Sequence, residues 1–133
     1  MRFVIDTNVF VSAMLFPLST PKQAVDKALA LGRLVLSRPV IQELADKFSS
    51  NKFDKRISRT DRLLYLETVI SLGLPVEPSE FVKACRDPND DMFLDLALAS
   101  SASCNISGDK ALLELHTFRG ILILSAADFL KVF

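Results

Sequence analysis

Short apolar runs of strand-type composition alternate along this chain with longer segments of helical periodicity. The strand-type runs cover residues 2–5, 33–37, 74–78, 104–107 and 120–125. Helical patterns cover residues 19–32, 38–50, 58–73, 87–102, 109–116 and 125–133, and residues 9–16 suit a buried helix or an extended segment. The strand-type runs show little polar alternation, which is typical of parallel strands covered by helices on both faces. The pattern therefore predicts a three-layer α/β/α sandwich around a central parallel sheet of about five strands.

Residues suited to helix N-termini support these bounds. Thr20 is a possible N-cap for the helical segment 19–32, and Thr60 for the segment 58–73. Ser125 and Asp128 have the spacing of a capping box at the start of the last one.

Length and composition limit the broad class of protein. A chain of 133 residues, 50% apolar and 24% charged, fits a single globular domain over residues 1–133. No apolar run is long enough to cross a membrane, and the first residues do not resemble a signal peptide. The two cysteines, Cys85 and Cys104, are expected to be reduced thiols, so we expect a cytoplasmic protein.

The charges of the chain cancel, so a polyanionic partner has to be bound by a local feature. The sequence holds 16 basic and 16 acidic residues. Residues 47–62 form a modest basic run, which can be interpreted as a phosphate-contact strip or as ordinary solvated charge. Its members are Lys47, Lys52, Lys55, Arg56, Arg59 and Arg62, against Asp54 and Asp61.

Acidic residues recur close to the ends of the predicted strands. Asp6 follows the first strand, Glu43 lies on the helix after the second, and Asp91 and Asp109 flank the strand at 104–107. The carboxyl ends of parallel strands meet at one edge of a sheet, where ligands are bound. Carboxylates gathered there repel one another unless cations intervene. The pattern indicates a site for a hard divalent ion, Mg²⁺ or Mn²⁺, and hence phosphodiester hydrolysis.

Three further aspartates around the last acidic segment have other interpretations. Asp87 precedes Pro88 as an N-cap, and Asp90 suits the positive end of the helix dipole, so both are assigned structural roles. Asp95 lies one helical turn after Asp91 and is either an auxiliary residue of the metal site or the partner of a buried Lys or Arg.

Five segments in order resemble the PIN domain, a fold of metal-dependent ribonucleases. They are "VIDTNVFVSAML", "SRPVIQEL", "CRDPNDDMFLDLALA", "ISGDKALLEL" and "GILILSAADFL". The third is similar to a segment of a bacterial branch described as toxins of toxin–antitoxin pairs. The likeness extends over essentially the whole chain.

The resemblance implies a set of roles. Asp6, Glu43, Asp91 and Asp109 become the catalytic acids that bind Mg²⁺ or Mn²⁺, supported by Asn8 and Ser107. Asp95 departs from the family pattern, which has a small apolar residue there, and Ser107 replaces threonine. RNA is the implied substrate, cleaved to a 3′-hydroxyl and a 5′-phosphate. A cognate antitoxin and a homodimer are the implied partners.

Two other functions fit part of the pattern. A haloacid dehalogenase-like phosphohydrolase also places an aspartate after its first strand, but it requires a second one where this chain has Asn8. A metal-binding interaction module without turnover would share the acidic edge.

Overall fold

Five parallel strands and one short antiparallel strand form the sheet at the centre of the molecule. The computed structural model describes residues 1–133, and its strand order is β3-β2-β1-β4-β6-β5. The strands are β1 (Arg2–Ile5), β2 (Arg33–Leu36), β3 (Leu74–Pro75), β4 (Cys104–Ile106), β5 (Thr117–Phe118) and β6 (Ile121–Leu124). Only β5 runs antiparallel, to β6. The predicted parallel sheet is confirmed, and β5 is an additional strand at the edge of the sheet beside β6.

Seven α-helices connect and cover these strands. They are α1 (Thr7–Leu15), α2 (Thr20–Leu31), α3 (Arg38–Phe48), α4 (Arg59–Leu72), α5 (Asp91–Ser100), α6 (Lys110–Leu113) and α7 (Ala126–Val132). Two 3-10 helices, η1 (Asn51–Phe53) and η2 (Pro88–Asp90), precede α4 and α5. The apolar segment 9–16 is thus helical, and the acidic segment starts as a 3-10 turn. None of the helices is both long and apolar enough to pass through a bilayer.

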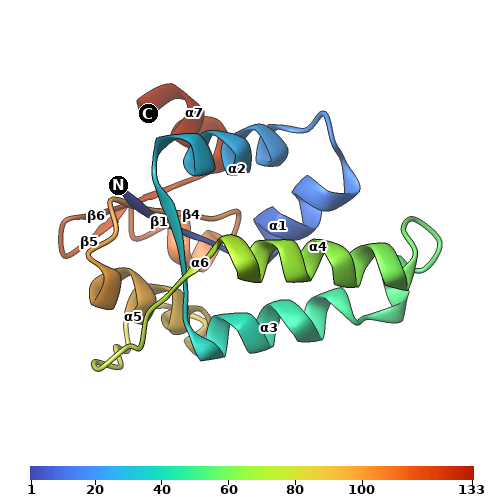
Figure 1. Ribbon diagram of the computed structural model, residues 1–133. Helices are drawn as coiled ribbons and strands as arrows, with labels where there is room; N and C mark the ends of the chain where they lie inside the picture. Colours follow the sequence, from blue (N-terminus) through green and yellow to red (C-terminus); the bar gives the residue numbers. More distant parts are fainter.

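The direction of the crossovers sets the layers. From β1 the chain steps to β2 and β3 on one side, and from β3 it returns to β4 and β6 on the other. Right-handed connections then place the helices of the two halves on opposite faces of the sheet. Helices α2 and α7 lie together on one face, whereas α5 lies on the other side of β1 and β2 (Figure 1). The order reverses between β1 and β4, the position at which open sheets of this kind bind ligands.

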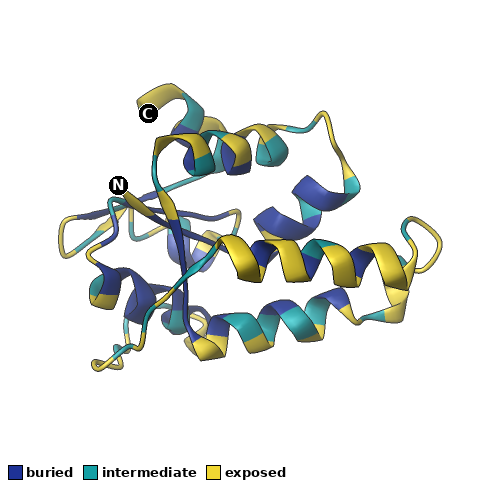
Figure 2. Ribbon diagram, in the orientation of Figure 1, coloured by how far each residue is buried: buried dark blue, intermediate teal, exposed yellow.

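The core is centred on β1 and its neighbours. Phe3 is fully buried, and its ring packs edge-on against those of Phe129 and Phe133 on and after α7, with centroid distances of 5.4 and 5.5 Å. Figure 2 shows α1 and α5 mostly buried, while the outer sides of α2 and α4 are exposed. The strand ends near β1 are therefore held by a well-packed centre.

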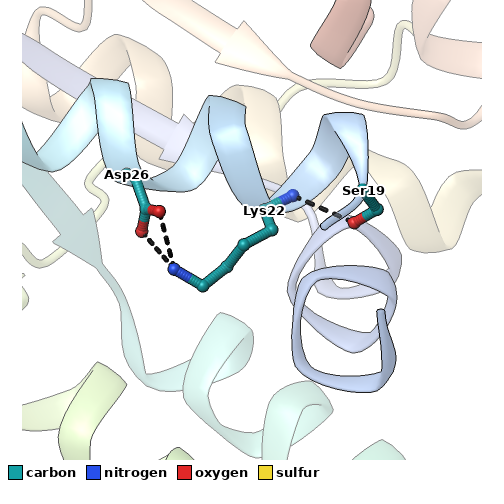
Figure 3. A network of polar contacts seen from close by, with 3 residues as sticks. All are labelled: Ser19, Lys22 and Asp26. Carbon is teal, nitrogen blue, oxygen red and sulfur yellow. Dashed lines mark hydrogen bonds and ion pairs between the residues drawn. The ribbon is translucent and has the colours of Figure 1, made fainter. Parts of the chain in front are cut away.

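Serines one or two residues upstream replace the expected threonine caps. The Ser19 hydroxyl accepts the backbone N–H of Lys22 at 3.3 Å, and Lys22 also pairs with Asp26 at 2.6 Å on the outside of α2 (Figure 3). Ser58 caps α4 in the same way. Thr20 and Thr60 lie inside the first turns, so their predicted capping role is wrong. The cap predicted for Ser125 is confirmed by its bond from the N–H of Asp128.

Candidate active site

An acidic cavity opens at the carboxyl ends of β1 and β4. Its volume is about 190 Å³, and nine of its ten lining residues are polar. The lining comprises Asp6, Thr7, Asn8, Glu43, Lys47, Asp87, Asn89, Asp90, Phe93 and Asp109. These residues come from the end of β1 into α1, from α3, from η2 and α5, and from the loop before α6, so the fold assembles the cavity from distant parts of the sequence.

Asp6 is a buried lining residue of this cavity and directly follows β1. It is the N-cap residue of α1 in backbone terms, but its carboxylate makes no capping bond. Instead it accepts hydrogen bonds from the Asn105 amide, at 3.2 Å, and from the Ser107 hydroxyl. Burial raises the pKa of Asp6 to about 7, against the lowering effect of these two bonds. The carboxylate is thus fixed in position while its charge is poorly solvated.

Glu43 faces Asp6 from α3. Its Oε2 accepts the Thr7 hydroxyl at 2.6 Å, which ties α3 to the first residue of α1. Lys47 lies one turn further along α3 and is the only cationic residue in the lining. Neither the Thr7 contact nor the Lys47 position was predicted as part of the acidic site.

Asp109 enters from the loop after β4. Its Oδ1 accepts the N–H of Ala111 at 2.8 Å, so it caps α6, and its own N–H donates to the Ser107 hydroxyl at 2.9 Å. Ser107 therefore bridges Asp6 and Asp109. This agrees with the supporting position expected for Ser107, and Asn8, also expected there, lines the rim.

Asp90, and not Asp91, lines the cavity together with Asp6, Glu43, Asp87 and Asp109. Asp90 is 8% exposed, makes no capping bond, and its Oδ2 is buried without any hydrogen-bond partner. Burial raises its pKa, and the nearby negative charge of Asp109 raises it further. A buried carboxylate oxygen without a hydrogen-bond donor destabilises the folded protein, and a bound cation would remove that penalty.

Asp91 lies on a different side of α5. Its Oδ1 accepts the backbone N–H groups of Ala84 and Cys85, at 3.2 and 2.8 Å, and it is absent from the cavity lining. The structure therefore does not bring Asp91 into this cavity, because these N–H groups hold its carboxylate against the chain that leads into η2.

Asp95 continues the same face of α5. Its Oδ1 accepts the N–H of Val82 at 2.8 Å. Asp95 does not line the acidic cavity. It also does not pair with a lysine or an arginine. Both roles considered for Asp95 are replaced by a third, in which Asp91 and Asp95 fasten residues 82–85 to the helix.

Asp87 combines its predicted role with a second one. Its Oδ1 accepts the N–H of Asn89, as expected of an N-cap, and the residue also lines the cavity. The sequence alone predicts a purely structural role for Asp90, because it does not show where α5 begins and therefore which aspartate faces the cavity. One signal pointed to it: Asp90 precedes Phe93, Leu94 and Ala97 by three, four and seven positions, so it continues the stripe packed toward the sheet.

The residues of this cavity suit a hydrated divalent ion. As they stand, the side chains form no group of three or more carboxylates, histidines or cysteines that could enclose an ion directly. Mg²⁺ keeps several waters and is bound through one or two carboxylates, and the cavity has room for both. All of its acidic ligand atoms are oxygens, and one of them, Oδ2 of Asp90, has no other partner. This donor set fits Mg²⁺ or Mn²⁺.

Comparisons with known proteins agree with the fold. A relative from Methanocaldococcus jannaschii, the uncharacterized protein MJ1680, is 32% identical over 117 residues, which is 86% of this chain and 75% of the relative. PAE2754 from Pyrobaculum aerophilum is similar in structure, with a TM-score of 0.66 and 14% identity over 98% of this chain and 88% of that one.

Two further structural neighbours are chains of VapBC complexes. VapBC2 from Rickettsia felis, bound to a DNA fragment from its promoter, gives a TM-score of 0.64 at 15% identity over 92% of this chain and 97% of that one. DNA-bound VapBC from Salmonella typhimurium gives 0.62 at 15% identity over 95% and 98%. At these identities the likeness concerns the fold. The sequence model of the PIN domain matches residues 2–111, so the chain belongs to the PIN domain family of nucleases.

Proposed function

We propose that this protein is a divalent-metal-dependent ribonuclease. The observation that carries the proposal is the convergence of Asp6, Glu43, Asp90 and Asp109, from four separate elements, on one cavity. So many carboxylates around one cavity repel one another unless a cation is bound. The membership of the PIN family gives the nuclease class, and the metal and the RNA substrate are the proposed refinements.

The chain's own residues prepare the site for this reaction. Asp6, Glu43, Asp90 and Asp109 would hold Mg²⁺ or Mn²⁺. Ser107 and Asn105 fix the carboxylate of Asp6, and Thr7 fixes that of Glu43. When bound, such an ion supplies hydroxide from water at neutral pH and neutralises charge on the phosphate. Water oxygen bonds to phosphorus, the bond from phosphorus to the 3′ oxygen breaks, and that oxygen takes up a proton. The products carry a 3′-hydroxyl and a 5′-phosphate.

Incubation of purified protein with end-labelled single-stranded RNA tests this proposal. Cleavage is expected with Mn²⁺ or Mg²⁺ and not with EDTA, and the fragments should be substrates for ligation that needs a 5′-phosphate. Equal cleavage in EDTA would exclude metal dependence. RNA that stays intact with either ion, while Mn²⁺ still binds, would favour the interaction module without turnover.

We further propose that the protein is the toxin of a toxin–antitoxin pair. The support is the similarity in fold to the VapBC chains and the resemblance of residues 85–99 to the toxin branch. Induced expression of the wild-type chain is then expected to arrest bacterial growth, and an Asp90→Asn variant expressed to the same level is not. Rescue by the product of an adjacent gene would identify the antitoxin. Unimpaired growth with an active nuclease present would contradict the toxin role.

The remaining expectations are proposals of the same kind. A homodimer is implied by the resemblance, and light scattering of the purified chain measures it. An enzyme acting on cellular RNA would work in the cytoplasm. The haloacid dehalogenase-like alternative loses its support, because the chain belongs to a different family.

A further inference from the structure

A cationic surface lies between α3 and α4, beyond the end of α3 whose Lys47 lines the acidic cavity. Four exposed residues of this connection and of the start of α4 carry positive charge, and we call them the basic tip: Lys52, Lys55, Arg56 and Arg59. The ion pairs of the structure involve none of them. Because the chain as a whole has no net charge, this tip is a local feature and not part of a general positive field.

Arg62 explains why the tip keeps its charge. This residue, 1% exposed, donates to the Asp54 carboxylate at 2.6 Å and to the Ser50 carbonyl at 2.9 Å. Asp54 is the one acidic residue within the connection, and it pairs with the buried Arg62 and not with a residue of the tip. The sequence grouped Arg62 with the surface cations, whereas the structure makes it the brace that holds the connection closed.

Lys47 links the basic tip to the cavity. It stands on α3 one turn after Glu43, in the cavity wall and on the side of the tip. On the other side of Glu43 a second, shallow cavity is lined by Gln42, Glu43 and Asp46, among others, and holds no cation. A chain of phosphates leaving the acidic cavity is therefore attracted toward the tip and repelled on the opposite side.

Aromatic rings accompany these cations. The Arg56 guanidinium lies 5.4 Å from the centroid of Phe16, which ends α1 and is 47% exposed. Lys52 lies 5.0 Å from the ring centroid of Phe53. Phe16 is exposed and Phe53 is half-buried. Accessible rings beside arginine and lysine can stack on unpaired bases while the cations contact phosphates.

We infer that the basic tip, with Lys47 and Phe16, binds single-stranded RNA and leads it into the acidic cavity. The inference rests on the proposed ribonuclease function and adds the path of the substrate. Lys47 would contact the phosphate nearest the cavity, the tip would contact phosphates further along the strand, and Phe16 would stack on a base. RNA is favoured over an acidic protein because the chain belongs to a nuclease family and because RNA offers bases to the aromatic rings as well as phosphates to the cations.

Binding of RNA in EDTA tests the path without requiring cleavage. Fluorescence anisotropy of a labelled, unstructured RNA of about 12 nucleotides gives the binding constant between about 0.05 and 0.2 M salt. For single strands, each phosphate contact adds about 0.7 to the slope of log K against log salt. The combined variant Lys55→Ala, Arg56→Ala, Arg59→Ala is expected to bind at least about 10-fold more weakly and to lose about 2 from the slope.

Single variants separate the parts of the path. Lys47→Ala is expected to lose about 0.7 from the slope, whereas Phe16→Leu is expected to weaken binding and leave the slope unchanged. Lys131→Ala, on α7 at the other side of the molecule, is the matched control and should bind like the wild type (Figure 1). Thermal melting of each variant confirms that it is folded.

Each outcome bears on one proposal. Wild-type affinity and slope in the combined variant, an equal loss in Lys131→Ala, or no RNA binding by the wild type would overturn the path. Polyglutamate that competes as well as RNA, with the same loss in the variants, would assign the tip to an acidic protein instead. RNA binding that follows the expected pattern without cleavage in any metal would reject the ribonuclease and leave the path intact.

Discussion

Asp90 and Asp91 are neighbours in sequence, and both are buried, yet they occupy opposite environments. Asp90 faces the cavity with one oxygen that has no donor, next to the carboxyl of Asp109. Asp91 faces residues 82–85 and accepts two backbone N–H groups. The difference shows that the function of a buried carboxylate depends on which donors reach it. Asp90 has an oxygen available for a cation. Asp91 instead holds the backbone of residues 84 and 85 through two hydrogen bonds.

Helix geometry explains how the two acids were separated. Successive residues of a helix point about 100° apart, so at most one of two adjacent side chains can face the sheet edge. Asp95, four residues after Asp91, shares its face and accepts the N–H of Val82. The four aspartates of residues 87–95 thus divide into a pair at the cavity, Asp87 and Asp90, and a pair that fastens the preceding loop.

The largest effect should come from removing the charge of Asp90. Asp90→Asn is expected to lower metal-dependent RNA cleavage by more than about 100-fold, beyond the range for residues that only support a metal site. The matched Asp91→Asn keeps an oxygen that can accept the same N–H groups, so its cleavage rate should stay close to that of the wild type. Initial rates on one labelled RNA in Mn²⁺ measure both. The reverse result would restore Asp91 to the metal site.

The free energy of unfolding should give the opposite ranking. Asp91→Ala leaves the N–H groups of Ala84 and Cys85 without an acceptor and is expected to cost about 1–3 kcal/mol for each one that water does not reach. Asp90→Ala removes a poorly solvated charge that has no donor, so the metal-free protein should lose little stability or gain some. Urea unfolding in EDTA compares the two alanine variants. A larger loss in Asp90→Ala would contradict the division between the two faces.

Metal should stabilise the protein through the cavity alone. Mn²⁺ at about ten times its dissociation constant is expected to add about 1.4 kcal/mol, which raises the melting temperature of the wild type. The rise should disappear in Asp90→Asn and in Asp6→Asn and persist in Asp91→Asn. Differential scanning calorimetry with and without Mn²⁺ measures it. An equal rise in all four proteins would place the ion elsewhere.

How much of this the sequence could predict depends on the range of the interactions. The parallel sheet and the position of Asp6 follow from local patterns, since a strand followed by a charged residue is visible in a few letters. The choice between Asp90 and Asp91 depends on where α5 begins, and the 3-10 turn at Pro88 shifts that point. Asn105 contacts Asp6 across 99 positions of sequence, and Thr7 contacts Glu43 across 36. No local pattern indicates such pairs.

The smallest effect on stability and cleavage is expected at Asp95. Of the two aspartates that hold residues 82–85, Asp95 accepts only one backbone N–H, that of Val82. Burial raises the pKa of Asp95, and the hydrogen bond from Val82 opposes that shift. Asp95→Asn can accept the same N–H without the buried charge and should change neither the stability nor the Mn²⁺ concentration needed for half-maximal cleavage. Asp95→Ala should lose about 1 kcal/mol of unfolding free energy, the typical net value of one hydrogen bond, again with an unchanged Mn²⁺ requirement.

Titration of cleavage against Mn²⁺, alongside urea unfolding in EDTA, separates the metal requirement from the stability. A Mn²⁺ requirement raised about 10-fold in Asp95→Asn at unchanged stability would show that Asp95 acts on the metal site through Asp91, and the two faces of α5 would then be one functional unit.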